Sequence, residues 1–440
     1  DIDVTKDSFD KKTLLKKNIS NKQLTAIKNL KLENFEIELR HSRHYPLGDQ
    51  IAPLIGFYGT DGAQEGLEKS YDKVLAGRSG RQKYFKNAKQ EIISQPIEIS
   101  KTIQGKDIHL TIDATIQFFA YKYLAEAIYD NKAEAGSVIV LDNKNGEVLA
   151  MASYPSYNPN HPQRKIQKNR ALVEAYELGS VLKPIVLSKA IDEEIIKDDE
   201  YIEIPRRLKL NDKVIVDSKI YEKLTPQEII AFSSQVGASK IALELGYDDL
   251  KRNYYDFGFT KPISINFPSS SFGYMNIKET VSDKELASLG YGYGLTISPF
   301  QIASAYSVFA NNGIYKDFKL LLNEQVTTRR IISKHSAEYI LKALEKVVKE
   351  GTGKTAEIRG FSQGGKTGTV HQTKRGSGYA EDSYRASFIG ITPLNEQSLT
   401  IFVSIDNPGL NAYSGGAVAA PLFAKIAESS LNHLGYFEDE

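Results

Sequence analysis

A serine and a lysine three residues apart, Ser180 and Lys183, are the first candidates for chemistry in the chain. They lie in the run Glu177-Leu178-Gly179-Ser180-Val181-Leu182-Lys183-Pro184, which leads into an apolar stretch ending at Ile191. Gly179 permits a sharp entry into a helix, and residues three apart share one helix face. A lysine buried beside apolar residues has a lowered pKa and can accept the proton of a hydroxyl group. The pair is therefore a candidate nucleophile with its base.

The same spacing also occurs at Ser8 and Lys11 and at Ser70 and Lys73. Both of these pairs lie among polar and charged residues, so we interpret them as surface residues. Because serine and lysine are common, the spacing at Ser180 does not establish catalysis by itself. Two later segments of the chain decide between the two interpretations.

Two polar segments follow later in the chain. The first, Ser233-Ser234-Gln235, lies between two predicted helices. The second, Lys366-Thr367-Gly368-Thr369, lies on a predicted strand and contains the one Lys-Thr-Gly sequence of the chain. The ordered set of serine–lysine, serine–amide and lysine–threonine resembles the arrangement in penicillin-recognising serine acyltransferases.

Four of these residues are expected to take part in moving protons. Ser180 is the expected nucleophile, and neutral Lys183 is the expected base that accepts its proton. Ser233 is expected to relay a proton toward the leaving nitrogen, and Lys366 to lower the cost of that transfer.

The remaining residues are expected to bind the substrate. Gln235 offers an amide to the peptide backbone of the substrate, and Thr367 offers a hydroxyl, beside the charge of Lys366, to a terminal carboxylate. Gly368 has no side chain, so a substrate can approach this strand closely. The backbone N–H groups of Ser180 and Thr369 are the expected oxyanion hole.

The elements that position these residues are predicted from caps, turns and hydrophobic periodicity. Asp113 is expected to cap a helix, and residues 143–146 read as a hairpin turn between strands at 136–142 and 147–151. Capping boxes are expected at Thr225 and at Ser298. Further strands are expected at 364–370, 386–391 and 399–405, with a closing helix at 418–431. We therefore predict an α+β domain whose antiparallel sheet is built from both ends of the segment and covered by helices.

Composition sets further bounds. The 440 residues favour two domains, which we place at 1–105, polar and without a catalytic cluster, and at 106–440. A net charge of +1 does not indicate the excess of basic residues that is typical of nucleic-acid-binding proteins. The absence of cysteine excludes disulfides, thiolate zinc sites and a cysteine nucleophile. The seven histidines show no ligand spacing, which agrees with the expectation of no metal and no cofactor that follows from the family resemblance given below. No apolar run approaches the roughly 18 residues that span a bilayer.

The chain resembles class B penicillin-binding proteins, which are peptidoglycan DD-transpeptidases, and the resemblance covers nearly its whole length. Besides the three motifs, the residues that carry it are Arg43, Tyr45, Pro46, Gly66-Leu67-Glu68, Leu110-Thr111-Ile112-Asp113, Gly146 to Met151, Tyr291 to Gly294, Pro299, Gln301, Gly415-Gly416 and Ala419-Ala420-Pro421. Residues 233–237 and 291–295 are more similar to the septal, cell-division type than to the elongation type.

The resemblance implies a penicillin-binding-protein and β-lactamase-like transpeptidase domain, preceded by an elongated pedestal that is mostly β or irregular. Such an enzyme takes peptidoglycan stem peptides ending in D-Ala-D-Ala, releases D-Ala and passes the acyl group to an amine. β-Lactam antibiotics would acylate Ser180. The resemblance also implies partners, a glycosyltransferase and other division proteins, and a place in the bacterial inner membrane facing the periplasm. The membrane anchor would lie upstream of Asp1.

One departure and two alternatives stay open. The family usually has asparagine where this chain has Gln235, which adds a methylene group and a rotatable bond. A DD-carboxypeptidase or a β-lactamase would use the same fold and nucleophile, but a β-lactamase needs a placed deacylating base, which the sequence does not reveal. A non-catalytic β-lactam sensor or division scaffold is the second alternative.

Overall fold

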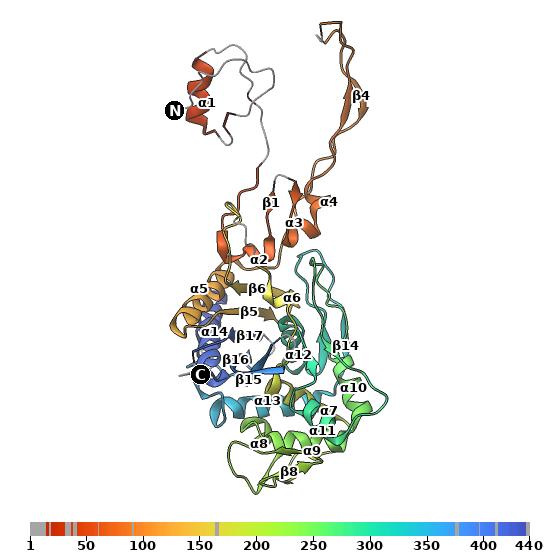
Figure 1. Ribbon diagram of the computed structural model, residues 1–440, viewed down its shortest axis with the longest axis vertical. Coiled ribbons are helices and arrows are strands. Elements are labelled where there is room, and N and C mark those ends of the chain that lie inside the picture. Colours follow the sequence, from red (N-terminus) through yellow and green to blue (C-terminus); the bar gives the residue numbers. More distant parts are fainter. Residues whose placement is uncertain are drawn as a thin grey trace. The chain divides into compact units, whose positions relative to one another are not determined.

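The computed structural model describes residues 15–16, 19–30, 37, 42–59, 61–89, 92–162, 167–374, 378–395, 397–409 and 412–436. The chain divides into two compact units, Asp1–His44 and Tyr45–Glu440 (Figure 1). The first unit contains α1 (Asn21–Asn29), which begins at a capping box formed by Ser20 and Gln23. The pair Ser8 and Lys11 lies outside the described residues.

The second unit is built on a five-stranded antiparallel sheet with the strand order β15-β16-β17-β5-β6. These strands are β5 (Ala135–Asp142), β6 (Glu147–Tyr154), β15 (Gly364–Lys374), β16 (Gly378–Thr392) and β17 (Leu399–Asp406). Two strands thus come from the start of the unit's sheet region and three from its end. This confirms the prediction of a sheet built from both ends of the segment.

The β5–β6 hairpin shows why the local sequence folds as predicted. Asp142 Oδ1 accepts hydrogen bonds from the backbone N–H groups of Lys144 (2.8 Å) and Asn145 (3.1 Å). Gly146 has a φ of +67°, a conformation that glycine adopts without a steric cost. The turn therefore fixes the register of β5 against β6, which lies at one edge of the sheet.

Helices cover both faces of the sheet, as the pattern of buried residues on β5 shows. Val138 and Val140 pack into a core with α5 (Ala114–Asp130) and α14 (Ala420–Leu434). Ile139 and Leu141 pack into the opposite core with α7 (Lys183–Asp192), α12 (Pro299–Ala310) and α13 (Lys334–Lys349). Figure 1 shows α5 and α14 together beside the sheet, with α12 on its other side.

Most of the remaining elements of the sheet domain lie in the middle of the chain, between β6 and β15, and η4 follows β17. They are α6 (Arg170–Val173), η2 (Gly179–Leu182), β7 (Ile202–Glu203), β8 (Leu208–Leu210), β9 (Lys213–Ile215), β10 (Lys223–Leu224), α8 (Pro226–Ala231), α9 (Gln235–Leu245), α10 (Tyr247–Asp256), β11 (Tyr274–Met275), α11 (Asp283–Gly290), β12 (Leu295–Thr296), β13 (Ile314–Lys316), β14 (Thr328–Arg330), η3 (Lys354–Ala356) and η4 (Gly415–Ala419). The predicted capping boxes at Thr225 and Ser298 begin α8 and α12, and Asp113 caps α5.

The residues before the sheet domain form short helices and two-stranded ribbons. They are η1 (Gly48–Gln50), α2 (Ala52–Ile55), β1 (Tyr58–Gly59), β2 (Gly62–Ala63), α3 (Gly66–Ser70), α4 (Asp72–Leu75), β3 (Arg81–Lys83) and β4 (Ile97–Ser100). Lys73 is exposed, as expected for a surface pair with Ser70. Across the described part of the chain, no helix combines the length and the apolar content needed to cross a membrane.

Candidate active site

A sharp turn before α7 presents Ser180. Gly179 has a φ of +56°, and a Cβ atom added there would lie 2.6 Å from Val370 Cγ1. Ser180 lies in the 3₁₀ turn η2 rather than in the α-helix itself, and its carbonyl accepts the N–H of Lys183 at the start of α7. Ser180 is partly exposed, whereas the Lys183 side chain is buried. The two residues therefore lie one turn apart, with the serine open to solvent and the lysine closed to it.

The Lys183 side chain is directed to the junction of α8 and α9. Its Nζ donates to the Ser233 carbonyl at 2.5 Å and lies 3.1 Å from Ser233 Oγ. Burial lowers the pKa of Lys183 to about 7, and the charge of Asp217 opposes this shift. A lysine with this pKa is neutral about half the time near pH 7, which suits a general base.

Lys366 approaches the same hydroxyl from the sheet. Its Nζ lies 3.0 Å from Ser233 Oγ and 3.4 Å from Thr367 Oγ1, and its side chain is fully buried. Burial, and then the neighbouring charge of Lys183, lowers the pKa of Lys366 well below its usual value of 10.5. The hydroxyl of Ser233 thus lies between two buried lysines, and a proton on either amine can reach it.

Ser233 is held in an unusual backbone conformation by its surroundings. It has a φ of +60°, which residues other than glycine rarely adopt. Asp217 binds the residues that follow Ser233. Its carboxylate accepts hydrogen bonds from Ser234 Oγ (2.5 Å) and from the backbone N–H groups of Gln235 (2.5 Å) and Val236 (3.1 Å). Asp217 therefore satisfies donors at the start of α9 and fixes the serine–amide segment.

The structure brings the glycine and threonine of β15 against the turn η2. A Cβ atom at Gly368 would lie 2.4 Å from Ser387 Oγ and 2.7 Å from Val181 Cγ2. Close packing within the protein is thus a physical reason for this glycine, besides the substrate approach that we expected. Thr369 Oγ1 accepts the N–H of Gly415 at 3.0 Å.

The two other candidate binding residues differ in their surroundings. Thr367 is buried, and its hydroxyl lies 2.9 Å from Thr352 Oγ1. Gln235 is exposed, and within the described residues its side-chain amide has no hydrogen-bond partner. Its amide is therefore available to a ligand. Together with Ser180, Lys183, Ser233 and Lys366, these residues gather where η2, the α8–α9 junction and β15 meet.

Two contributors to the site were missed by the sequence analysis. Asp217 lies in an irregular loop after β9, with no pattern that links it to α9. Tyr306 on α12 donates its hydroxyl to the Val181 carbonyl at 2.6 Å, next to Ser180. It lies in an apolar helical run that reads only as core, so no local signal identified either residue.

A cavity of about 550 Å³ is lined in part by residues that lie near the candidate residues in sequence, and by none of the candidates themselves. Glu177, three residues before Ser180, lines it on one side, and Val370 and His371, which follow Thr369, line it on another. Its volume is in the range of small-molecule and peptide sites. In the described part of the chain, no group of three or more histidine, aspartate or glutamate residues has the arrangement of a metal site.

Comparisons with known proteins agree with this arrangement. The family described as "Penicillin binding protein transpeptidase domain" matches residues 136–428, and "Penicillin-binding Protein dimerisation domain" matches residues 4–110. The "Probable peptidoglycan D,D-transpeptidase PenA" of Neisseria gonorrhoeae is 34% identical over 96% of this chain and 74% of that protein. The "Peptidoglycan D,D-transpeptidase FtsI" of Escherichia coli K12 is 33% identical over 91% of this chain and 68% of that protein.

Solved structures show the same similarity. The transpeptidase domain of Burkholderia pseudomallei penicillin-binding protein 3 is 30% identical, with a TM-score of 0.69, over 76% of this chain and 98% of that one. Penicillin-binding protein 3 of Mycobacterium tuberculosis, in complex with aztreonam, is 28% identical, with a TM-score of 0.79, over 90% of this chain and 91% of that one.

Proposed function

Since the chain belongs to the penicillin-binding protein transpeptidase family, we propose that it is a peptidoglycan D,D-transpeptidase that acts through an acyl-enzyme on Ser180. Relatives that carry this activity in their names match most of its length. The chain is accordingly a penicillin-binding acyltransferase, and the serine mechanism is our assignment from its own residues.

Acylation begins with the loss of the Ser180 proton. Lys183 is the base, because burial lowers its pKa to about 7 and it lies one turn from the nucleophile. Oγ of Ser180 attacks the carbonyl of the penultimate D-Ala residue. The backbone N–H groups of Ser180 and Thr369 stabilise the oxyanion that forms. The close packing of η2 against β15 supports this placement.

Collapse of the tetrahedral intermediate then releases D-Ala. The leaving nitrogen takes a proton from Ser233, which is replenished from Lys183 or Lys366, since both amines lie within 3.1 Å of its hydroxyl. An amine from a neighbouring stem then attacks the acyl-enzyme, and the same groups accept its proton. β-Lactams react at the first step as substrate mimics.

Substrate binding is assigned to the residues around this pair. The terminal carboxylate binds Lys366 and Thr367, and its charge raises the pKa of the lysine and so holds that amine protonated. Gln235 binds the peptide backbone of the stem through its exposed amide. Gly368 lets the substrate lie along the edge of β15.

The biological setting is part of the same proposal. We assign residues 1–105 to a pedestal domain and residues 106–440 to the transpeptidase domain. Septal cell-wall synthesis is the role, consistent with relatives named for FtsI. A glycosyltransferase and other division proteins are the expected partners. We place the domain in the periplasm, tethered to the inner membrane by a segment upstream.

The observation that carries the proposal is the hydroxyl of Ser233 between the amines of Lys183 and Lys366. The test is incubation with a synthetic stem pentapeptide ending in D-Ala-D-Ala, with and without an amine acceptor. We expect D-Ala release and an acceptor-dependent crosslinked product, both lost in Ser180→Ala. Ser70→Ala, which changes the serine of the surface pair, should retain both. Release of D-Ala without transfer, under all acceptor conditions, would instead identify a carboxypeptidase.

A further inference from the structure

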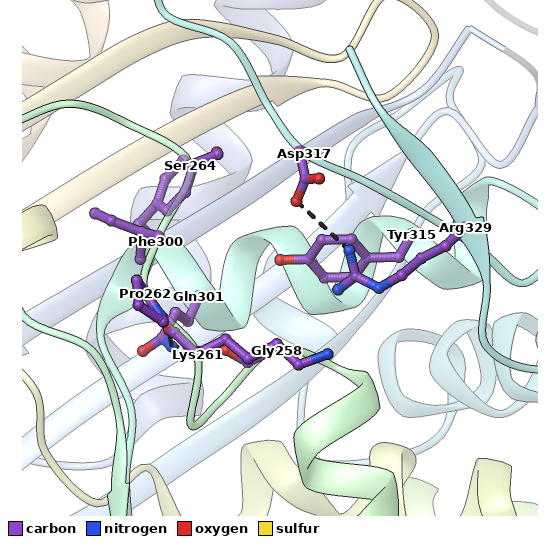
Figure 2. Close-up of a pocket in the computed structure, with 10 residues that line it drawn as sticks. Gly258, Lys261, Pro262, Ser264, Phe300, Gln301, Tyr315, Asp317 and Arg329 are labelled. Atoms are coloured by element: carbon purple, nitrogen blue, oxygen red, sulfur yellow. Dashed lines mark hydrogen bonds and ion pairs between the residues drawn. The ribbon is translucent and has the colours of Figure 1, made fainter.

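A second cavity, of about 340 Å³, is lined by none of the candidate catalytic residues, and Figure 2 shows the residues that line it. It is formed by the loop that follows α10, the first turn of α12 and the ribbon of β13 and β14. None of its lining residues belongs to η2, α7, the α8–α9 junction or β15. The cavity is thus lined by residues other than those of the site described above, although α12 also carries Tyr306.

An arginine with unused hydrogen-bonding capacity lines this cavity. The Arg329 guanidinium stacks 3.9 Å from the centre of the Tyr315 ring, and its Nη2 donates to the Asp256 carbonyl at 3.3 Å. Its Nη1 lies 3.6 Å from Asp317 Oδ1, which is longer than a hydrogen bond. Its buried Nε has no hydrogen-bond partner among the described residues. The guanidinium is therefore held in place by Tyr315, Asp256 and Asp317, and its Nη1 group, which makes only the long contact to Asp317, is the donor left for a ligand.

A lysine adds a second positive charge to the same cavity. Lys261 Nζ lies 3.7 Å from the centre of the Tyr255 ring and makes no ion pair within the described part of the chain. Burial, and then the charge of Arg329, lowers the pKa of Lys261, whereas Asp256 and Asp317 act in the opposite direction. A bound anion between the two cations would relieve their mutual repulsion.

The opposite wall is apolar and fixed. Figure 2 shows Pro262 and Phe300 facing Arg329 and Tyr315 across the cavity. Gln301 holds the loop in place, because its Nε2 donates to the carbonyls of Gly258 (2.8 Å), Phe259 (3.0 Å) and Lys261 (3.2 Å). The cavity is thus formed before any ligand binds, which reduces the entropic cost of binding.

These features define the chemistry of the occupant. The two cations favour an anionic group, and planar carboxylates match the donor geometry of a guanidinium. The carboxylate of Asp317 disfavours a second negative charge, so a monoanion fits better than a phosphate dianion. The apolar wall requires a hydrocarbon or aromatic body.

We propose that this cavity binds a small monocarboxylic acid with a compact apolar body, whose carboxylate accepts hydrogen bonds from Lys261 and Arg329 and whose apolar part packs on Phe300. This site is separate from the proposed transpeptidase site and does not depend on it. A carboxylate attached to an apolar body occurs both in a free acid and in the C-terminal residue of a peptide.

The test is calorimetric titration of the full chain with 3-phenylpropionate, with the neutral 3-phenylpropan-1-ol in parallel. We expect the acid to bind with one-to-one stoichiometry and the alcohol to bind at least tenfold more weakly. Lys261→Met should weaken binding of the acid by roughly tenfold or more, because a charge-assisted hydrogen bond is lost. Lys209→Met, which changes an exposed lysine on β8, is the matched control and should leave the affinity unchanged.

The opposite results would overturn the proposal. They are no binding of the acid, equal binding of acid and alcohol, or an affinity that Lys261→Met leaves unchanged; the last would place the acid elsewhere, for example at Lys366. Titration with N-acetylphenylalanine separates the two sources. Tighter binding than that of 3-phenylpropionate would identify a peptide C-terminus, and weaker binding a free acid.

Discussion

Replacing Lys183 with methionine should make the folded protein more stable near neutral pH, although it removes the proposed base. Methionine has a similar length and no polar head to desolvate. Burial lowers the pKa of Lys183 from 10.5 to about 7. Because each tenfold change in proton affinity is worth about 1.4 kcal/mol, this shift costs the folded state about 5 kcal/mol below pH 7.

The sign follows from proton binding in the two states. Between pH 7 and pH 10.5 the unfolded chain keeps its lysine proton while the folded chain has lost it. The unfolded state therefore binds more protons, and the stability of the parent rises with pH across this window. The free-energy cost of burying Lys183 in the folded state has its whole value of about 5 kcal/mol below pH 7 and falls to less than ~1 kcal/mol near pH 10.5.

The replacement also has a cost. Lys183 Nζ donates to the carbonyl and the hydroxyl of Ser233, and losing these bonds costs about 1–3 kcal/mol in total. We therefore expect Lys183→Met to be about 2–4 kcal/mol more stable than the parent near pH 7. This advantage should vanish or reverse near pH 10.5, where only the lost hydrogen bonds remain.

The assay is urea unfolding followed by circular dichroism at several pH values between 6 and 10.5. The informative quantity is the difference in unfolding free energy between variant and parent, since titrating groups that do not interact with Lys183 cancel in it. Lys366 does not cancel, because the charge of Lys183 lowers its pKa, and the loss of this repulsion favours the variant further at the lower pH values. Lys209→Met, on the exposed face of β8, controls for the change in composition. A difference that does not vary with pH, or a parent that is the more stable protein at pH 7, would refute the burial argument.

Three further predictions concern the same site. Asp217→Asn removes the charge that raises the pKa of Lys183, so the acid limb of the pH profile for β-lactam acylation should move to lower pH in stopped-flow measurements; an unchanged midpoint would contradict the coupling. Gly179→Ala should slow acylation and destabilise the fold by at least ~1 kcal/mol, because the φ of +56° and a close contact both oppose a Cβ atom. Its control is Gly435→Ala, where φ is +74° but no atom lies within 4 Å; equal effects in thermal melts would remove the role of close packing. Gln235→Asn should preserve acylation and change the relative rates across a panel of β-lactams, and identical rates would show that its exposed amide makes no selective contact.

The parts of the fold that follow local rules were predictable. The hairpin at residues 143–146 and the capping boxes at Thr225 and Ser298 depend on residues within four positions of one another. The order of the three motifs, on a turn, a helix junction and a strand, likewise follows from local patterns. A sheet assembled from both ends of the segment followed from counting strand patterns around a helical middle.

The parts that depend on tertiary contacts were not predictable. Asp217 reaches the start of α9 from a loop 16 residues before Ser233, and no periodicity links the two. Tyr306 is one apolar residue among many until its hydroxyl is found at the Val181 carbonyl. The positive φ of Ser233 has no sequence signature of the kind that glycine provides. In each case a contact between distant segments, rather than a local pattern, defines the role.

The central claim, that Ser180 is the nucleophile of an acyl-enzyme, is tested most directly by intact-protein mass spectrometry after incubation with benzylpenicillin. The account predicts a slowly hydrolysed adduct with the mass of the whole drug, mapped by peptide digestion to Ser180 and absent from Ser180→Ala. An adduct that persists in Ser180→Ala, or one that maps to another serine, would contradict it.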